Sequence, residues 1–349
     1  MVAVLLALLA AQDPREVSVP WKHESLVPRP SVRNILLYQN LARKAGGGRE
    51  SDQALRSALD WLGRHQDPDG SWDGSIETTG LALNAFLNAG FTTWPQADGR
   101  VPYGPRAVTP ACSPAALRQV ESHARVVRRA VAFLVRSQDA SGFIGSRESS
   151  EGLRAHAIAA RALAEAYGWT LLLILREPAE KALDALLKEP IPADDVLIAW
   201  WALALRSARL NGIPYPRALE DQLHLKRRPP GPFSLRRAGI EMLVWNRSRK
   251  GESDPDPEEL RSRIRVDEID PEECFWMSSG ALRYDGIGGP VWKLWYPPLL
   301  KTLLLQQERD PEELRGSWKP HGGGSRAMAT AFHALSFAAP YEMPVFWAR

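Results

Sequence analysis

One helix-and-turn segment occurs twice in this chain. The two copies are Ala58-x-x-Trp61-Leu62-x-x-x-Gln66-x-x-x-Gly70-x-Trp72 and Ala130-x-x-Phe133-Leu134-x-x-x-Gln138-x-x-x-Gly142. Repeats of this kind are typical of architectures in which each unit buries its apolar face only against its neighbours. The repeat therefore constrains the fold more than any single residue does.

Each copy predicts an outer helix followed by an inner one. In the first unit Leu55, Leu59 and Leu62 share one helix face while charged residues occupy the other, as in a helix with one face in solvent. After a turn at Asp67-Pro68-Asp69-Gly70, residues 78–87 are apolar or small nearly all round, which predicts a buried helix. The second unit repeats this pair at 127–137 and 155–167.

Further helix pairs are predicted towards the C-terminus. They are 181–186 with 196–208, 217–225 with 235–245, and 299–307 with 326–337. Between the two helices of the last pair lies Gly316-Ser317-Trp318, which matches the Gly-x-Trp end of the repeat. Because alternating outer and inner helices close most economically into a double ring, we expect an all-α fold, an α/α toroid of about five helix pairs.

The remaining segments predict the limits of this domain. Residues 1–11 are apolar and end in small residues, like the hydrophobic region of a secretory signal, although a short buried segment or a misassigned start also fits. Residues 12–50 predict a linker with one short helix. We expect the toroid at 51–345, with long loops at 91–122, where prolines are frequent, and at 249–290. The signal-like start predicts an exported protein, periplasmic or secreted.

Composition and residue spacing argue against several classes of protein. The chain has 44 Lys and Arg against 41 Asp and Glu, and the arginines are scattered among acids, which argues against nucleic-acid binding. Cys112 and Cys274 are too few for a cysteine zinc site, and leave open one disulfide between them. The seven histidines lack His-x-x-x-His spacing. We expect no cofactor, no metal, no nucleic-acid partner and no transmembrane span in the mature chain.

The repeated motif resembles the QW motif of the prenyltransferase and squalene-oxidase repeat (terpenoid cyclase-like) superfamily. The resemblance is fullest at 58–72, partial at 130–144 and short at 316–318, and it covers about Ser51 to Ala339. It implies an α/α barrel and says little about chemistry. The Gln is expected to bind carbonyls at the end of its own helix, the Gly to permit the turn, and the Trp to fill space between units. These structural residues are Trp61, Gln66, Gly70, Trp72, Phe133, Gln138, Gly142, Gly316 and Trp318.

The catalytic motifs of that superfamily's enzymes do not occur in the sequence. The Asp-x-Asp-Asp acid of class II terpene cyclases has its nearest match in Asp194-Asp195, where an acidic pair also suits a helix N-terminus. Neither cysteine matches the Asp-x-Cys segment of zinc-containing protein prenyltransferases. The resemblance thus implies the scaffold without its known catalytic residues.

Six residues are candidates for a ligand site at the rim of the cavity. Glu77 and His156 lie at or near the starts of inner helices, although a satisfied interior histidine is the more ordinary role for His156. A glycine run follows His321 and leads to Arg326 at a helix start, which suits an anion site or a flexible linker. The candidates are Glu77, His156, Asp194, Asp195, His321 and Arg326. Trp200, Trp201, Trp245, Trp276, Trp292 and Trp295 either line a cavity or pack the core.

These observations predict a binding or interaction module with a central cavity, which takes an unknown apolar or glycan ligand or a protein partner. Two enzyme classes remain as alternatives: a divergent terpene cyclase-like enzyme, and a secreted polysaccharide (polyuronate) lyase on a similar toroid. A lyase would need a basic residue facing a carboxylate-bearing sugar. Arg, Asp and Glu gathered at one rim would favour the acidic glycan, and an aromatic and aliphatic lining with an isolated carboxyl would favour a terpene. A cavity filled by side chains would leave only a binding surface.

Overall fold

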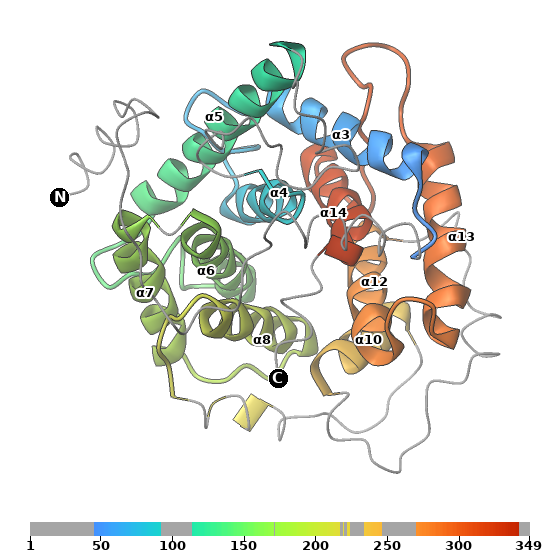
Figure 1. Ribbon diagram of the computed structural model, residues 1–349. Helices are drawn as coiled ribbons and strands as arrows, with labels where there is room; N and C mark the ends of the chain where they lie inside the picture. The colour runs from blue at the N-terminus through green and yellow to red at the C-terminus, as the bar shows by residue number, and fades with distance from the viewer. Residues whose placement is uncertain are drawn as a thin grey trace. The chain divides into compact units, whose positions relative to one another are not determined.

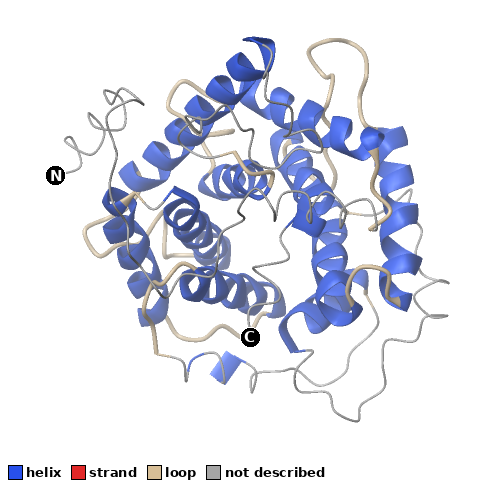
Figure 2. Ribbon diagram, in the orientation of Figure 1, coloured by secondary structure: helices blue, strands red, loops and turns tan. Residues whose placement is uncertain are grey.

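Helices form the regular structure of this protein. The computed structural model describes residues 45–91, 114–170, 172–216, 219, 222–223, 234–245 and 270–341. Within these ranges there are ten α-helices and no β-strand (Figure 2). The all-α prediction is confirmed there, and none of these helices is long and apolar enough to cross a membrane. The predicted signal-like segment, the linker up to residue 44 and most of 217–225 lie outside the described residues.

The chain folds into two compact units. Unit 1 contains Gly63–Pro190 and Leu203–Tyr215, and unit 2 contains Leu36–Leu62, Ile191–Ala202 and Pro216–Arg349. Two helices contribute residues to both units. They are α3 (Arg49–Arg64) and α8 (Asp195–Leu210).

Two buried helices form the core of unit 1. α4 (Ile76–Asn88) is buried at nearly every residue, and α6 (Ser150–Thr170) is buried from His156 to Gly168. They lie side by side (Figure 1), with α4 also against α5 (Pro114–Arg136) and α6 against α7 (Leu173–Lys188). The close approach depends on Gly80, because a Cβ there would lie 2.8 Å from Ile158 Cγ2. Small residues thus let the two inner helices of this unit pack tightly.

The predicted loop at 91–122 is too long at its C-terminal end. Helix α5 begins at Pro114, so residues 114–122 are helical. Proline is favoured in the first turn of a helix, where its missing N–H has no intrahelical partner to lose. The proline that was taken as evidence for a loop is therefore the start of the helix.

Unit 2 is built around a helix that lies within the predicted loop at 249–290. α12 (Pro271–Asp285) packs on α10 (Leu235–Ile240), α13 (Pro290–Gln306) and α14 (Arg326–Ala338). The predicted loop at 249–290 is therefore wrong at 271–285. Asp270, which accepts a hydrogen bond from the Glu272 N–H at 2.7 Å, caps this helix, so the acidic cluster marks a helix start.

The described residues accordingly contain more buried helical elements than five pairs require. A π-helical turn at Glu241–Trp245 continues α10, and a 3-10 turn at Ala339–Tyr341 follows α14. The six buried elements are α4, α6, α8, α10 with its π turn, α12 and α14. In unit 2, α10 and α12 cross where a Cβ on Gly280 would lie 2.3 Å from the Gly239 carbonyl oxygen.

Tryptophans pack the core of unit 2. Six tryptophans were predicted either to line a cavity or to pack the core, and their side chains are 0–2 % exposed: Trp200, Trp201, Trp245, Trp276, Trp292 and Trp295. Within unit 2, Trp200 stacks on Phe275 with ring centroids 5.3 Å apart and meets Trp276 at 4.8 Å. The core-packing interpretation is therefore confirmed.

Candidate functional site

Three turns share one pattern of side-chain hydrogen bonds. In each, the Nε2 of a glutamine donates to the carbonyl of the turn glycine and to a backbone carbonyl of a second helix, which is α5, α7 or α3. The pairs of acceptors are Gly70 and Val126 for Gln66 (3.0 and 3.0 Å), Gly142 and Pro178 for Gln138 (2.9 and 3.0 Å), and Gly316 and Ala54 for Gln307 (2.9 and 2.9 Å). The expectation that each glutamine binds its own helix is wrong, because its amide reaches across the turn to the neighbouring helix.

The glycine of each turn is required by two features of its environment. Gly70, Gly142 and Gly316 have φ angles of 96°, 94° and 97°, which favour glycine. A Cβ on them would lie 2.3, 2.2 and 2.1 Å from the carbonyl oxygens of Arg129, Lys181 and Ser57 respectively. Each of these carbonyls comes three residues after the one that the glutamine binds. The turns are therefore docked on that second helix in the same way.

Gln307 is a structural residue that the sequence analysis missed. Nine positions separate it from Gly316, whereas four separate Gln66 from Gly70, so the spacing of the motif did not find it. The turn keeps its main hydrogen bonds despite this insertion, with the Glu308 N–H donating to the Ser317 carbonyl at 2.9 Å. A glutamine at the end of an apolar helix before Gly-x-Trp was the available signal.

The aromatic residues of the motif are buried or half-buried, and the ring contacts of its tryptophans are with the helix that follows in the same repeat, so filling of space between units stays a prediction. Trp72 stacks on Phe86 with ring centroids 6.4 Å apart, and Trp318 lies 5.8 Å from Phe337. Trp61 is buried, and its Nε1 donates to the Glu313 carbonyl at 2.7 Å. Phe133 is half-buried.

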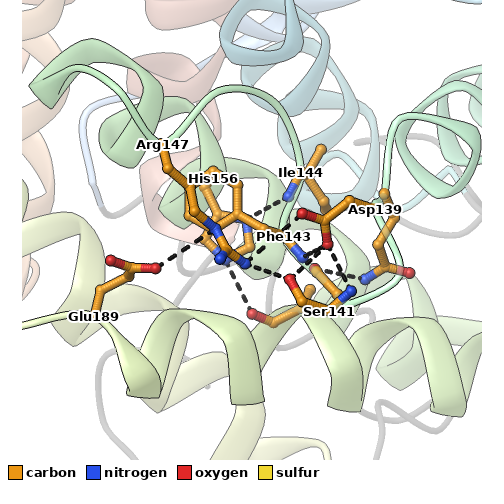
Figure 3. A network of polar contacts seen from close by, with 10 residues as sticks. Asp139, Ser141, Phe143, Ile144, Arg147, His156 and Glu189 are labelled. Carbon is orange, nitrogen blue, oxygen red and sulfur yellow. Dashed lines mark hydrogen bonds and ion pairs between the residues drawn. The ribbon is translucent and has the colours of Figure 1, made fainter.

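His156 has a structural role that two threonines perform in the other turns. The N–H groups of Trp72 and Trp318 donate to the hydroxyls of Thr79 (3.1 Å) and Thr330 (3.3 Å), and that of Ile144 donates to His156 Nδ1 at 3.0 Å. Because a backbone N–H only donates, Nδ1 accepts and the ring proton is on Nε2, 3.1 Å from the Ala182 carbonyl. Figure 3 shows both contacts of this imidazole.

Burial keeps His156 neutral. Desolvation lowers the pKa of His156 from 6.5 to about 4, because the charged ring would lose its hydration. The ring also stacks on Phe143 with centroids 4.0 Å apart. The satisfied-interior interpretation of His156 is confirmed, and both nitrogens are engaged within the fold.

The guanidinium of Arg147 lies over the Phe143 ring and is paired with two carboxylates (Figure 3). The Arg147 guanidinium lies 4.6 Å from the ring centroid, and 3.7 and 3.6 Å from carboxylate oxygens of Asp139 and Glu189. Asp139 accepts hydrogen bonds from the Ser141 hydroxyl at 2.6 Å and from the Phe143 N–H at 3.0 Å. The Ser141 hydroxyl is the main cause of the lowered pKa of Asp139. The cluster fixes the second turn.

The other rim candidates also have local contacts. Glu77 pairs with Arg154 of α6 at 2.7 Å, and Asp194 accepts the Leu197 N–H at 2.9 Å, which caps α8. Asp195 is the first residue of α8. Arg326 donates to the Ser317 hydroxyl at 3.1 Å and lies 3.7 Å from a Glu308 carboxylate oxygen, so it braces the third turn.

Exposed His321 belongs to a small charged cluster in unit 2. Its Nε2 lies 4.0 Å from Asp270 Oδ2. Arg236 of α10 lies 3.7 Å from Asp270 Oδ1 and 3.6 Å from a Glu272 carboxylate oxygen. Burial raises the pKa of Glu273, which follows in the same turn. This cluster gathers basic and acidic groups at the start of α12.

Four polar side chains are buried within the inner helices of unit 1, and we call them the polar belt. Asn84 and Asn88 of α4 are 0 % and 4 % exposed, and Arg161 and Glu165 of α6 are 0 % and 3 % exposed. The inner helices were expected to be apolar and almost uncharged, so these residues were missed. Charged residues inside an alanine-rich helix were the available signal.

The packing of α4 on α6 places the residues of the polar belt on two neighbouring helices. The Glu77–Arg154 ion pair and the contact of Gly80 with Ile158 set the two helices parallel, in one register. Asn84 and Asn88 follow Gly80 by one and two turns on the same face, and Glu165 follows Ile158 by two turns on the facing one. The belt therefore lies towards the C-terminal ends of both helices.

In three residues of the polar belt, one side-chain atom is buried without a hydrogen-bond partner among the described residues. These atoms are Asn84 Oδ1, Asn88 Nδ2 and Glu165 Oε1. The other end of the Asn84 carboxamide donates to the Gly80 carbonyl at 2.9 Å. Leaving such an atom unmatched costs about 1–3 kcal/mol, and native proteins hold few of them. The belt is therefore the strongest candidate for a functional site in unit 1.

Metal binding gains no support in the described part of the chain. It contains no group of three or more His, Cys, Asp or Glu side chains that could hold a metal ion. The calcium-like spacing around Asp69 is a turn, in which Asp69 accepts the Ser71 N–H at 2.9 Å and the Ser71 hydroxyl at 2.7 Å. Cys274 is a free buried thiol, and burial raises its pKa.

Comparisons with known proteins do not identify a relative of this chain. No model of a known protein family matches the sequence. Searches of the curated proteins and of the solved structures also give no match. Family membership is therefore not established, and the site is interpreted from its own residues.

Proposed function

We propose that this chain is an α/α toroid of the prenyltransferase and squalene-oxidase repeat type, and that it serves as a binding module. The third turn supports the ring. In an open array of repeats the last turn has no following outer helix, whereas here Gln307 donates to Ala54 of α3, the first described helix. The last repeat is thus fastened to the first, and the six buried elements favour six pairs over five.

Binding is favoured over catalysis by the roles of the predicted rim residues. Glu77, His156 and Arg326 hold helices or turns in place, and Asp194 caps a helix. These contacts account for the side chains without a reaction. The signal-like residues 1–11 remain the basis for proposing that the module is exported.

The polar belt is the observation that carries the binding function. Its unmatched atoms lower the stability of the folded protein, and such a cost is typical of residues retained for a ligand. A structural network would instead have its donors and acceptors paired. The two interpretations therefore differ in what an apolar substitution does to stability.

The test compares two buried substitutions of similar size in unit 1. Asn88→Leu removes an unmatched belt carboxamide, and we expect the free energy of unfolding in urea to stay unchanged or rise. Thr79→Val is the matched control, because Thr79 is fully buried and hydrogen bonded to Trp72 and Ser75, and it should lose about 1–3 kcal/mol. An Asn88→Leu protein that loses as much as the control would overturn the proposed site.

A second outcome would overturn the choice of binding over catalysis. The cluster of Arg236, Asp270 and Glu272 is the arrangement that favours an acidic glycan as substrate. Purified protein incubated with polygalacturonate or alginate should release no unsaturated product, as followed by ultraviolet absorbance. Release that Arg236→Ala abolishes would make the protein a lyase.

A further inference from the structure

One exposed dipeptide in unit 1 combines a reactive sequence with a backbone that leaves it unprotected. It is Asp73-Gly74, which joins the first turn of the repeat to helix α4. We propose that this dipeptide is a site of spontaneous covalent modification, at which Asp73 converts through a cyclic succinimide to isoaspartate.

The reaction is an internal ring closure. The backbone nitrogen of Gly74 attacks the side-chain carbonyl carbon of Asp73, a C–N bond forms, and the hydroxyl of the protonated carboxyl leaves with the N–H proton as water. Water then opens the five-membered imide at either carbonyl, which gives back aspartate or gives isoaspartate. The water lost in the first step is regained in the second, so no other reactant is needed. Glycine hinders the attack least, because it has no side chain.

The sequence alone would select a different pair. Glycine also follows an Asp or Asn at four other positions: Asp69-Gly70, Asp98-Gly99, Asn211-Gly212 and Asp285-Gly286. At neutral pH a carboxamide is attacked more readily than a carboxylate, because the carboxylate charge repels the nucleophile. In an unfolded chain Asn211 is therefore expected to close first, with loss of ammonia. Asp98-Gly99 lies outside the described residues, and the fold determines the order among the rest.

Burial protects Asn211 from this reaction. Its side chain is 8 % exposed, and its Nδ2 donates to the Ser207 carbonyl at 2.7 Å. The carboxamide also fills the space beside Gly168 of α6, where an added Cβ would lie 1.7 Å from its Oδ1. The Gly212 N–H donates to the Arg209 carbonyl at 3.2 Å. Both the electrophile and the nucleophile of this pair are therefore held in place.

Hydrogen bonds protect the two other described pairs. Asp69 Oδ1 accepts the Ser71 N–H at 2.9 Å and the Ser71 hydroxyl at 2.7 Å. The Gly70 N–H donates to a carbonyl within the same turn at 2.9 Å. Asp285 Oδ2 accepts the Val291 N–H at 2.6 Å. Ring closure at either position would first have to break these contacts.

None of these protections applies to Asp73-Gly74. Both residues are exposed, and neither the Asp73 carboxylate nor the Gly74 N–H has a hydrogen-bond partner among the described residues. They are the central residues of a turn, with φ angles of 58° and 62°, in which the Ser75 N–H donates to the Trp72 carbonyl at 2.9 Å. Positive φ is disfavoured for a residue with a Cβ, so the preference of Asp73 does not oppose its rotation during ring closure.

Isoaspartate at this position lengthens the connection into α4. The Trp72 N–H donates to the Thr79 hydroxyl at 3.1 Å, and the Ser75 hydroxyl accepts the Thr78 N–H at 3.2 Å, which caps the helix. Only two residues separate Trp72 from Ser75. Because isoaspartate adds the side-chain methylene to this short connection, we expect the modified protein to unfold at a lower urea concentration than the unmodified one.

The experiment incubates the full-length protein at neutral pH, folded in one sample and unfolded in urea in the other. Isoaspartate is quantified by the methyl groups that an isoaspartyl methyltransferase adds from labelled S-adenosylmethionine, and it is located by fragmentation of proteolytic peptides. In urea we expect Asn211 to react before Asp73. In the folded protein we expect the order to reverse, with more isoaspartate at Asp73 than at Asp69, Asn211 or Asp285.

Two variants test the assignment by an independent readout. Asp73→Glu should lower the methyl label of the folded protein, because glutamate would have to close a six-membered ring, which forms more slowly. Asp184→Glu is the matched control, because it makes the same change at an exposed residue of α7 that no glycine follows, and it should leave the label unchanged.

Two results would overturn the proposal. The first is a folded protein in which isoaspartate accumulates at Asn211, Asp69 or Asp285 before it does so at Asp73. The second is no isoaspartate at Asp73 in the folded protein over a time in which the unfolded chain forms it there. Both are measured on the wild type, so they remain decisive even if Asp73→Glu fails to fold.

Discussion

The neutral state of His156 predicts a loss of stability in mild acid. The folded protein holds this imidazole with a pKa of about 4, whereas its ordinary value is 6.5. A base whose pKa is lowered by folding contributes its full stability above 6.5 and loses it as the pH falls from 6.5 towards 4. Between pH 7.5 and pH 4.5 the loss amounts to roughly 2–3 kcal/mol for this single group.

The matched substitution for this prediction is His156→Thr, because threonine accepts the equivalent N–H in the first and third turns. Urea unfolding at pH 7.5, 6.5, 5.5 and 4.5 should give the variant a flatter profile than the wild type, by about the 2–3 kcal/mol calculated above. Burial lowers the pKa of His333 to about 3, so this histidine also makes the protein less stable as the pH falls. Its contribution to the loss of stability is the same in the wild type and in the variant.

Two measurements would refute this reasoning. The first is a His156→Thr profile as steep as that of the wild type, whatever the offset in stability. The second is an NMR titration in which the imidazole of folded His156 ionises near 6.5.

Two further predictions concern the turns. Gln307→Ala removes both hydrogen bonds of the closing glutamine and should cost about 1–3 kcal/mol while it raises hydrogen exchange in α3; exchange no faster there than in Gln306→Ala would contradict the closing contact. Gly142→Ala should cost more than about 3 kcal/mol, because it adds a collision with Lys181 to a strained φ. Gly288→Ala has a similar φ of 89° and no atom within 4 Å of the added Cβ, so it should cost about 1–2 kcal/mol. Thermal unfolding of both glycine variants measures the difference, and equal losses would contradict the collision.

The sequence predicted the inner helices of both units where composition and periodicity agreed. α4, α6 and α14 consist mostly of small or apolar residues, and their burial follows from that pattern. The acids at Asp270-Pro271-Glu272-Glu273 do mark a helix start, as their pattern predicts, but the loop predicted at 249–290 covered the body of α12 because a charged, proline-containing stretch precedes it. The acids cap the helix, and the apolar residues that bury it come afterwards. The charged residues before and at the start of α12 therefore favoured a loop over a helix in the prediction for 249–290.

The candidate site was less predictable than the fold. The sequence pointed to residues near helix starts, and there the structure uses Glu77, His156 and Asp194 for packing and capping. Asn84 and Glu165 lie in the interior of helices that the hydrophobic pattern already explained. Whether a buried polar atom has a partner depends on the neighbouring helix, which periodicity along one segment does not reveal.

The third turn shows where this scaffold accepts additional sequence. Gln307 and Gly316 make the same hydrogen bonds as their counterparts although more residues separate them. The residues between Gln307 and Gly316, which we call the two anchors of the turn, are mostly exposed, and the hydrogen bonds of both anchors are kept. The segment between the anchors is therefore a natural grafting position. A foreign peptide inserted in the shorter turn, between Gln138 and Gly142, would be displayed on a frame fixed at both ends, as long as the glutamine and glycine are retained.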